Sequence, residues 1–235
     1  MRKYINQTML LMALCCVIST ATLAQDSTVH VIRDLETWSS ATLNYKPIKK
    51  LELSLSQHLR LKDNSQTVDV YFTQLTADYK IVKGLSIGLG LRYIRENDDQ
   101  GKVQGYENHL RWQTDLGYKY NFDRLSLKAR LRYQSKDELN VTDDKVSNAT
   151  RFKLSAGYNI PDWKFDPSAS AEFFNGITGN EGLYKIRYTV GTKYRTESAG
   201  NFGLFLRTEM QQQGEYPKRT NVIGFKYDYT LKNNK

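Results

Sequence analysis

The residue types best suited to acid–base chemistry gather around His109. Glu107, His109 and Arg111 alternate along one stretch, so in an extended chain their side chains point to the same side. An imidazole acts as a general base when a neighbouring group orients it. His58 is a second candidate base, and Glu107 and Asp115 are candidate orienting carboxylates. These four residues, His109, His58, Glu107 and Asp115, are the candidate catalytic residues of a hydrolase built into a wall of strands.

A hydrogen-bonded residue in a polar wall is the simpler interpretation of both histidines. Neither His58 nor His109 is followed by a serine two residues later, and no ligand spacing surrounds them. The sequence therefore predicts no metal and no cofactor, and catalysis is an alternative to a non-enzymatic role.

Several other kinds of site are disfavoured by the sequence. The only two cysteines, Cys15 and Cys16, lie near the N-terminus, so the rest of the chain offers no disulfide or thiolate ligand. Neither follows a small residue, which argues against lipidation. The net charge of +9 is basic, but charges and rings alternate between Lys185 and Arg195 and so lie on opposite faces. We expect no nucleic-acid partner.

The first 24 residues are typical of a cleaved signal peptide. Arg2 and Lys3 precede an apolar stretch from Met9 to Leu23, and Ala24 ends a small-residue cleavage site. An uncleaved membrane anchor is the alternative, but the apolar run is short for a spanning helix. The sequence predicts export of the remainder of the chain.

Alternation of apolar and polar residues with a period of two dominates the rest of the sequence. Odd positions are apolar and even positions mainly polar or small in both Leu85–Tyr93 and Leu125–Tyr133, a spacing that fits strands and not helices. Most of the predicted strands match the length of a tilted membrane-spanning strand, about 9–11 residues plus overhang. The predicted strands are 35–45, 49–61, 68–81, 84–96, 105–120, 123–136, 148–160, 163–175, 183–196, 201–213 and 219–231.

The connections between these strands alternate between short turns and longer polar loops. Short periplasmic turns and longer outer loops are the pattern of outer-membrane β-barrels. The predicted strands number eleven, whereas bacterial barrels usually have an even number. We favour twelve, with a further strand near Thr28–Arg33, and ten is the alternative if the N-terminal part leaves the wall.

Aromatic residues separate a membrane barrel from a soluble one. Tyrosines fall in two rows on the apolar face, and Tyr71 and Tyr79 are 8 residues apart whereas Tyr106 and Tyr118 are 12 apart. These separations correspond to roughly 20–30 Å, which brackets the apolar band of an outer-membrane barrel. The predicted membrane-interface tyrosines are Tyr45, Tyr79, Tyr118, Tyr158, Tyr194 and Tyr229 near the short turns, and Tyr71, Tyr93, Tyr106, Tyr133 and Tyr184 near the long loops. Trp38 and Trp112 are expected at the interface or in the wall.

The opposite face of the predicted strands is rich in charge. A polar interior is normal for such a barrel, and ion pairs between neighbouring strands stabilise its wall. The excess of Lys and Arg over Asp and Glu suggests a weak preference for anions. The predicted lumen-facing residues are Glu52, Arg60, Asp78, Arg92, Arg111, Arg130, Arg132, Arg151, Glu172, Arg187, Arg207 and Glu209.

Several segments carry a resemblance to a known family. They are the stretches beginning at Asp34, Arg151, Glu172, Lys185 and Asn221. Through them the chain resembles the Bacteroidetes outer-membrane proteins catalogued as domain of unknown function 2490. The resemblance covers most of the chain after the signal peptide and implies a fold and a location, but no established activity.

The sequence thus predicts an all-β protein. Residues 25–235 are expected to form a single up-and-down antiparallel barrel of ten to twelve strands in the bacterial outer membrane. The first functional hypothesis is a structural barrel or a narrow, weakly anion-preferring channel. The alternatives are a lipid- or lipopolysaccharide-modifying enzyme and a protein whose outer loops bind a partner. Expected partners are membrane lipids, lipopolysaccharide and the barrel-assembly machinery.

Overall fold

A computed structural model describes residues 32–99, 104–141, 146–179, 181–196, 199–214 and 216–231. The predicted signal peptide, residues 1–24, lies outside these residues, as does most of the possible strand near Thr28–Arg33. The described part of the chain has no helix long and apolar enough to cross a membrane.

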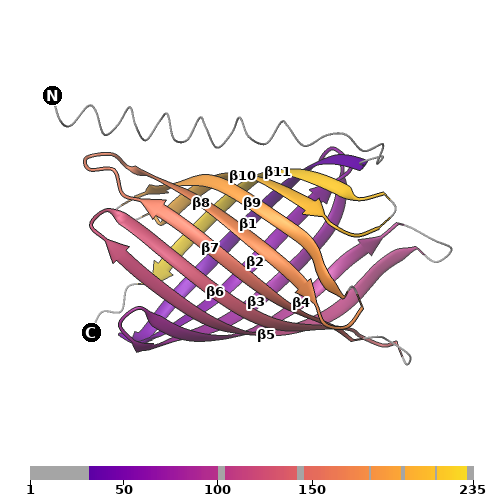
Figure 1. Ribbon diagram of the computed structural model, residues 1–235, viewed down its shortest axis with the longest axis horizontal. Helices are drawn as coiled ribbons and strands as arrows, with labels where there is room; N and C mark the ends of the chain where they lie inside the picture. Colours follow the sequence, from indigo (N-terminus) through magenta and orange to yellow (C-terminus); the bar gives the residue numbers. More distant parts are fainter. Residues whose placement is uncertain are drawn as a thin grey trace. The chain divides into compact units, whose positions relative to one another are not determined.

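In the part of the chain that the structure describes, eleven tilted strands follow one another around a closed barrel (Figure 1). Each strand pairs with its neighbours in the sequence, so the predicted up-and-down barrel is confirmed. The strands are β1 (Ile32–Ile48), β2 (Leu51–Lys62), β3 (Thr67–Val82), β4 (Leu85–Asp98), β5 (Gly105–Phe122), β6 (Leu125–Glu138), β7 (Ser147–Tyr158), β8 (Phe165–Gly176), β9 (Gly182–Arg195), β10 (Asn201–Gln211) and β11 (Lys218–Leu231).

The barrel closes where β1 pairs with β11, and we call this pairing the seam. It runs in parallel from Ile32 opposite Lys218 to Tyr45 opposite Leu231, whereas every other pairing is antiparallel. In an up-and-down barrel with an odd number of strands, the first and last strands run in the same direction, so a parallel seam is required. The predicted range of ten to twelve strands is confirmed, but the favoured count of twelve is wrong for this wall, which closes at eleven.

The two faces of the wall differ because successive side chains of a strand point in opposite directions. Large apolar side chains are exposed on the outside, for example Leu75, Leu89 and Leu131, which are 55%, 61% and 51% accessible. The buried side chains lie on the inside, and they include charged residues such as Arg132 and Glu172. The barrel therefore has an apolar exterior and a polar interior.

Short turns and longer loops alternate from β1 to β7 as the sequence predicts, but on the short-turn side six residues join β7 to β8 and five join β9 to β10, so the short turns predicted there are wrong. Two-residue turns join β1 to β2, β3 to β4 and β5 to β6, and longer connections follow β2, β4, β6, β8 and β10. We call the end of the barrel that carries the longer connections the long-loop rim. Here the carboxylate of Asp34 accepts hydrogen bonds from the backbone amides of Asp63 and Asn64, which have positive φ. This contact ties the β2–β3 turn to β1.

Candidate functional site

The most deeply buried charge inside the barrel is the carboxylate of Glu172 on β8, which is 2% accessible. Arg130 and Arg151 each donate a hydrogen bond to its Oε1 at 2.7 Å, and Arg187 donates to its Oε2 at 3.1 Å. We call these three arginines, from β6, β7 and β9, the arginine cradle. A buried carboxylate is costly unless charged donors satisfy it, and here the cradle supplies them from three strands.

Arg187 extends the cradle toward β10. Its guanidinium also binds the buried carboxylate of Glu209, which Lys185 approaches at 3.1 Å. Glu172, Arg187 and Glu209 are direct cross-strand partners on β8, β9 and β10, so the sheet register itself aligns the alternating charges. Together with the rest of the arginine cradle, these contacts cross-link β6 to β10 from the inside.

A second group of interior arginines lies against aromatic rings. Trp38 on β1 is 7% accessible, and the guanidinium carbons of Arg60 and Arg207 lie 3.7 and 4.7 Å from its ring centroid. Arg207 also covers Phe205 at 4.6 Å, and its Nε donates to the hydroxyl of Thr189. Aromatic faces attract cations, so the rings stabilise the charges without neutralising them.

The same arrangement continues on β3 and β4. The guanidinium of Arg92 lies 3.8 Å from the ring centroid of Phe72, which is 2% accessible, and Arg92 donates to the side-chain oxygen of Gln74. The guanidinium carbon of Arg60 lies 5.2 Å from the same Phe72 ring centroid. We call Arg60, Arg92 and Arg207 the ring-bound arginines. Their contacts are with aromatic rings and neutral oxygens, whereas the cradle arginines bind a carboxylate.

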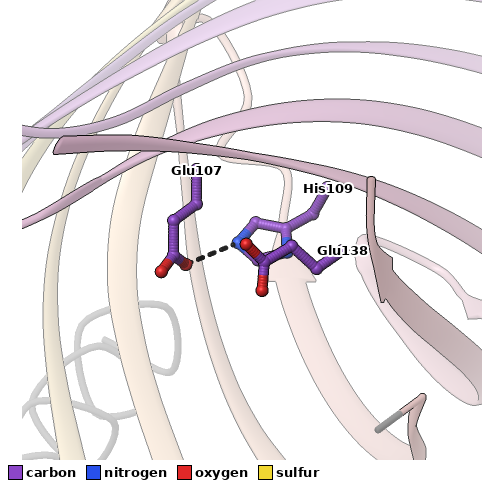
Figure 2. A group of neighbouring side chains, drawn as sticks. All are labelled: Glu107, His109 and Glu138. Carbon is purple, nitrogen blue, oxygen red and sulfur yellow. Dashed lines mark ion pairs between the residues drawn. The ribbon is translucent and has the colours of Figure 1, made fainter. Parts of the chain in front are cut away.

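A third group lies at the long-loop rim, where Glu107, His109 and Glu138 converge (Figure 2). His109 on β5 faces Glu138 on β6 as a direct cross-strand partner, and Glu107 lies two residues before His109 on the same strand. Nε2 of His109 is 3.2 Å from a carboxylate oxygen of Glu107. One ligand atom from each residue lies within 4.8 Å of the others. We call these three residues the rim cluster.

Two other carboxylates near this rim form ion pairs with lysines. Lys136 on β6 contacts Glu96 on β4 at 2.6 Å, across the intervening strand β5. Lys62 at the end of β2 donates to Asp99 at 2.8 Å, and this hydrogen bond lowers the pKa of Asp99. The rim thus combines several carboxylates with two lysines that are already engaged.

Residues 35–220 match the DUF2490 family, whose members are described as proteins of unknown function, and this match covers more than half of the chain. The chain belongs to the DUF2490 family. The resemblance to this family in the sequence is thereby confirmed. No curated protein and no solved structure matches the chain.

The four candidate catalytic residues of this DUF2490 barrel do not form one site. His109 and Glu107 meet in the rim cluster. His58 lies on β2, where its ring stacks on Phe72 at 4.3 Å between centroids, with Ser56 as its hydrogen-bond partner. Asp115 is about 20 Å along β5 from His109.

Asp115 has a different partner from the one expected. Arg132 donates to both of its carboxylate oxygens, at 2.6 and 2.7 Å. This bidentate pair fixes Asp115 within the wall of the DUF2490 barrel, so its role as an orienting group for a histidine is wrong.

The residues predicted to face the lumen have varied surroundings. Six of them are buried, and Arg60, Arg92, Arg130 and Arg207 are partly accessible with the partners given above. Arg111 donates to the side chain of Gln113, and Glu52 pairs with Lys46 at 3.1 Å. A carboxylate oxygen of Asp78 lies beside Gly88, at a point that any larger side chain would fill. The six buried residues are Arg111, Arg132, Arg151, Glu172, Arg187 and Glu209.

Most of the predicted interface tyrosines of the DUF2490 barrel are exposed or partly exposed on its outer face, but Tyr184 is not placed as expected. A register shift between Phe174 and Asn175 interrupts the β8–β9 pairing beside Tyr184. Its ring lies against interior Phe174, with 6.0 Å between centroids. The exposed tyrosines are Tyr45, Tyr79, Tyr93, Tyr106, Tyr118, Tyr133 and Tyr158, and the half-buried ones are Tyr71, Tyr194 and Tyr229.

The sequence did not lead us to expect aromatic residues in the interior, and Trp38 was expected at the interface or in the wall. Phe72 and Phe174 each follow an aromatic residue of the outer face, Tyr71 and Phe173, so their parity already indicated the inner face. Glu138 was missed as well. The two-residue turn between Phe122 and Leu125 sets the β5–β6 register, and counting from it places Glu138 opposite His109.

Proposed function

We propose that the protein is an outer-membrane barrel whose lumen forms a narrow passage with a preference for small anions. The support for a membrane location is the apolar exterior. Exposed Leu43, Leu55, Leu75, Leu91 and Trp112 are successive cross-strand partners on β1 to β5, so they form an unbroken apolar row. Soluble monomers rarely expose an apolar patch larger than a few hundred Å².

Geometry supports a passage of small diameter. Eleven strands spaced about 4.8 Å apart and tilted by about 40° enclose a circle roughly 20 Å across, measured between backbones. Long side chains project into this space, and the arginine cradle draws three of them together around Glu172. Such an interior leaves room for small solutes only.

The observation that carries the anion preference is the set of ring-bound arginines. Among the described residues, Arg60, Arg92 and Arg207 form no ion pair: they contact Trp38, Phe72, Phe205 and neutral oxygens, and carboxylates such as Glu209 act on Arg60 and Arg207 only at longer range. A narrow passage lined by an excess of charge of one sign concentrates ions of the other sign.

Planar-bilayer recording across a potassium chloride gradient tests this function. We expect small conductance steps with a reversal potential shifted toward that of chloride. Replacing Arg60, Arg92 and Arg207 together by Gln should move the reversal potential toward zero, whereas the turn variant Lys83→Gln should leave it unchanged. Silent bilayers with correctly folded protein, or a preference for cations, would contradict the channel.

Cell fractionation tests the location separately. The protein should sediment with outer membranes, and its mobility on a denaturing gel should change on heating, as folded membrane barrels do. Recovery from the periplasm as a soluble protein would contradict the membrane location, whatever the bilayer recordings show.

A further inference from the structure

We propose that the rim cluster is a binding site for a divalent transition-metal ion, with Glu107, His109 and Glu138 as its protein ligands. The proposal concerns a site at the long-loop rim and does not depend on conduction through the lumen.

The rim cluster has a ligand composition suited to a transition-metal ion. It offers two carboxylates and one imidazole from adjacent strands, with ligand atoms within 4.8 Å of one another. Tetrahedral coordination at about 2.1 Å separates donor atoms by about 3.4 Å. The contact of 3.2 Å between His109 and Glu107 already matches this separation, and Glu138, whose ligand atom lies within 4.8 Å, would have to move closer to complete the set.

The imidazole of His109 is buried beside these carboxylates. The side chain of His109 is 8% accessible, and among the residues that the structure describes its Nε2 has no hydrogen-bond partner. Carboxylate oxygens of Glu107 and Glu96 lie 3.2 and 3.5 Å from this nitrogen, but neither contact is aligned for a hydrogen bond. A buried polar atom without a partner is costly, and coordination of a metal ion would satisfy it.

The charges around the rim cluster also favour a bound cation. Glu107 lies within range of the charges of Glu96, Asp98 and Glu138, as well as that of His109. Lys136 on β6 contacts Glu96 on β4 at 2.6 Å across β5, the strand that carries Glu107, and so offsets the charge of Glu96. A bound dication would relieve the repulsion between the carboxylates that face His109.

The rim cluster also has the surroundings that a metal site needs. Glu107 is partly open to solvent, with a side chain 38% accessible, so an ion can enter and a water molecule can complete its coordination. Both β5 and β6 are long, regular strands here, and their antiparallel register holds His109 opposite Glu138. An imidazole nitrogen favours Zn²⁺, Co²⁺ or Ni²⁺ over Ca²⁺ and Mg²⁺, which prefer oxygen ligands alone.

Isothermal titration of the folded, untagged barrel in detergent with Zn²⁺ tests the site, with Co²⁺ absorption as a second readout of coordination. His30 is first replaced by Ala, so that His58 and His109 are the only imidazoles. We expect one Zn²⁺ per chain. His109→Ala should weaken binding by at least about 100-fold, because losing even an outer-shell partner typically costs 10–100-fold. Glu138→Gln should also weaken Zn²⁺ binding.

His58→Ala is the matched control, because it removes the other interior imidazole and should leave the affinity unchanged. His109→Cys supplies a thiolate and should restore Zn²⁺ binding, and it decides the matter together with Glu138→Gln if the alanine variant does not fold. Equal Zn²⁺ affinity in parent and His109→Ala would overturn the proposal. So would Ca²⁺ binding as tight as Zn²⁺ binding, since that indicates an acidic rim without a role for His109.

Discussion

Glu172 and Arg151 form an ion pair inside the barrel, with Nη2 of Arg151 donating to Oε1 of Glu172 at 2.7 Å and both side chains at least 92% buried. The same carboxylate accepts from Arg130 and Arg187, so one negative charge organises three positive ones. Removing it leaves the three arginines facing one another.

Glu172→Gln should therefore destabilise the barrel. The substitution keeps the shape of the side chain but removes the countercharge of the arginine cradle, and breaking a buried ion pair costs about 3–5 kcal/mol. Urea unfolding in lipid vesicles measures the loss. Glu181→Gln, at an exposed position between β8 and β9, is the control and should change little. Equal free energies of unfolding for the two variants would show that the charge of Glu172 does not stabilise the arginine cradle.

Gly224 makes room for the interior aromatic rings. It lies opposite Trp38 in the seam and opposite Phe205 on β10, and a Cβ atom there would overlap the ring of Phe205. Gly224→Ala should cost about 1–3 kcal/mol, as overpacking does. Adding Phe205→Leu should recover part of that loss. Gly157→Ala is the control, because a Cβ atom there would lie 3.9 Å from the backbone oxygen of Pro167, an ordinary van der Waals contact.

Leu131 lies in the middle of β6 on the outer face, between its partners Leu116 and Phe152. In a membrane, Leu131→Arg should cost about 2–4 kcal/mol, whereas Val82→Arg at the end of β3 should cost about 0–1 kcal/mol. Folding into vesicles, followed by urea titration, gives both values. Tolerance of both substitutions to the same degree would argue for a barrel surrounded by water.

The seam predicts a specific cross-link. Leu43 and Tyr229 are direct partners in the β1–β11 register, and the only cysteines of the chain are Cys15 and Cys16. The double variant Leu43→Cys/Tyr229→Cys should form a disulfide that holds the barrel closed in a heated gel without reductant. The variant Leu43→Cys/Phe225→Cys, whose positions are about 13 Å out of register, should not form a disulfide. Cross-linking of the second pair alone would mean a shifted seam.

The strands were predictable because one apolar face produces an alternation that few other structures share. The sixth predicted strand, 123–136, corresponds to β6 (Leu125–Glu138), and the ninth, 183–196, corresponds to β9 (Gly182–Arg195). The first strand was predicted too short, because Arg33 and Asp34 interrupt the apolar pattern before Leu35.

Partners across the barrel were harder to predict than strands. A period of two tells which residues share the inner face, but not which of them touch. Asp115 was expected to serve a histidine and instead binds Arg132, because register and not sequence distance decides its neighbour. Tyr184 was misplaced because a local register shift changes parity without leaving a mark in the sequence.

The parallel seam also determines how the barrel comes apart. Ten of the eleven strand pairings join segments that a single connection links along the chain, so those strands stay tethered when their hydrogen bonds break. The fourteen residue pairs between β1 and β11 have no such tether, and parallel pairing is slightly weaker per residue. Thermal or mechanical opening should begin there, and the lifetime of the folded protein then depends on one line of contacts down its wall.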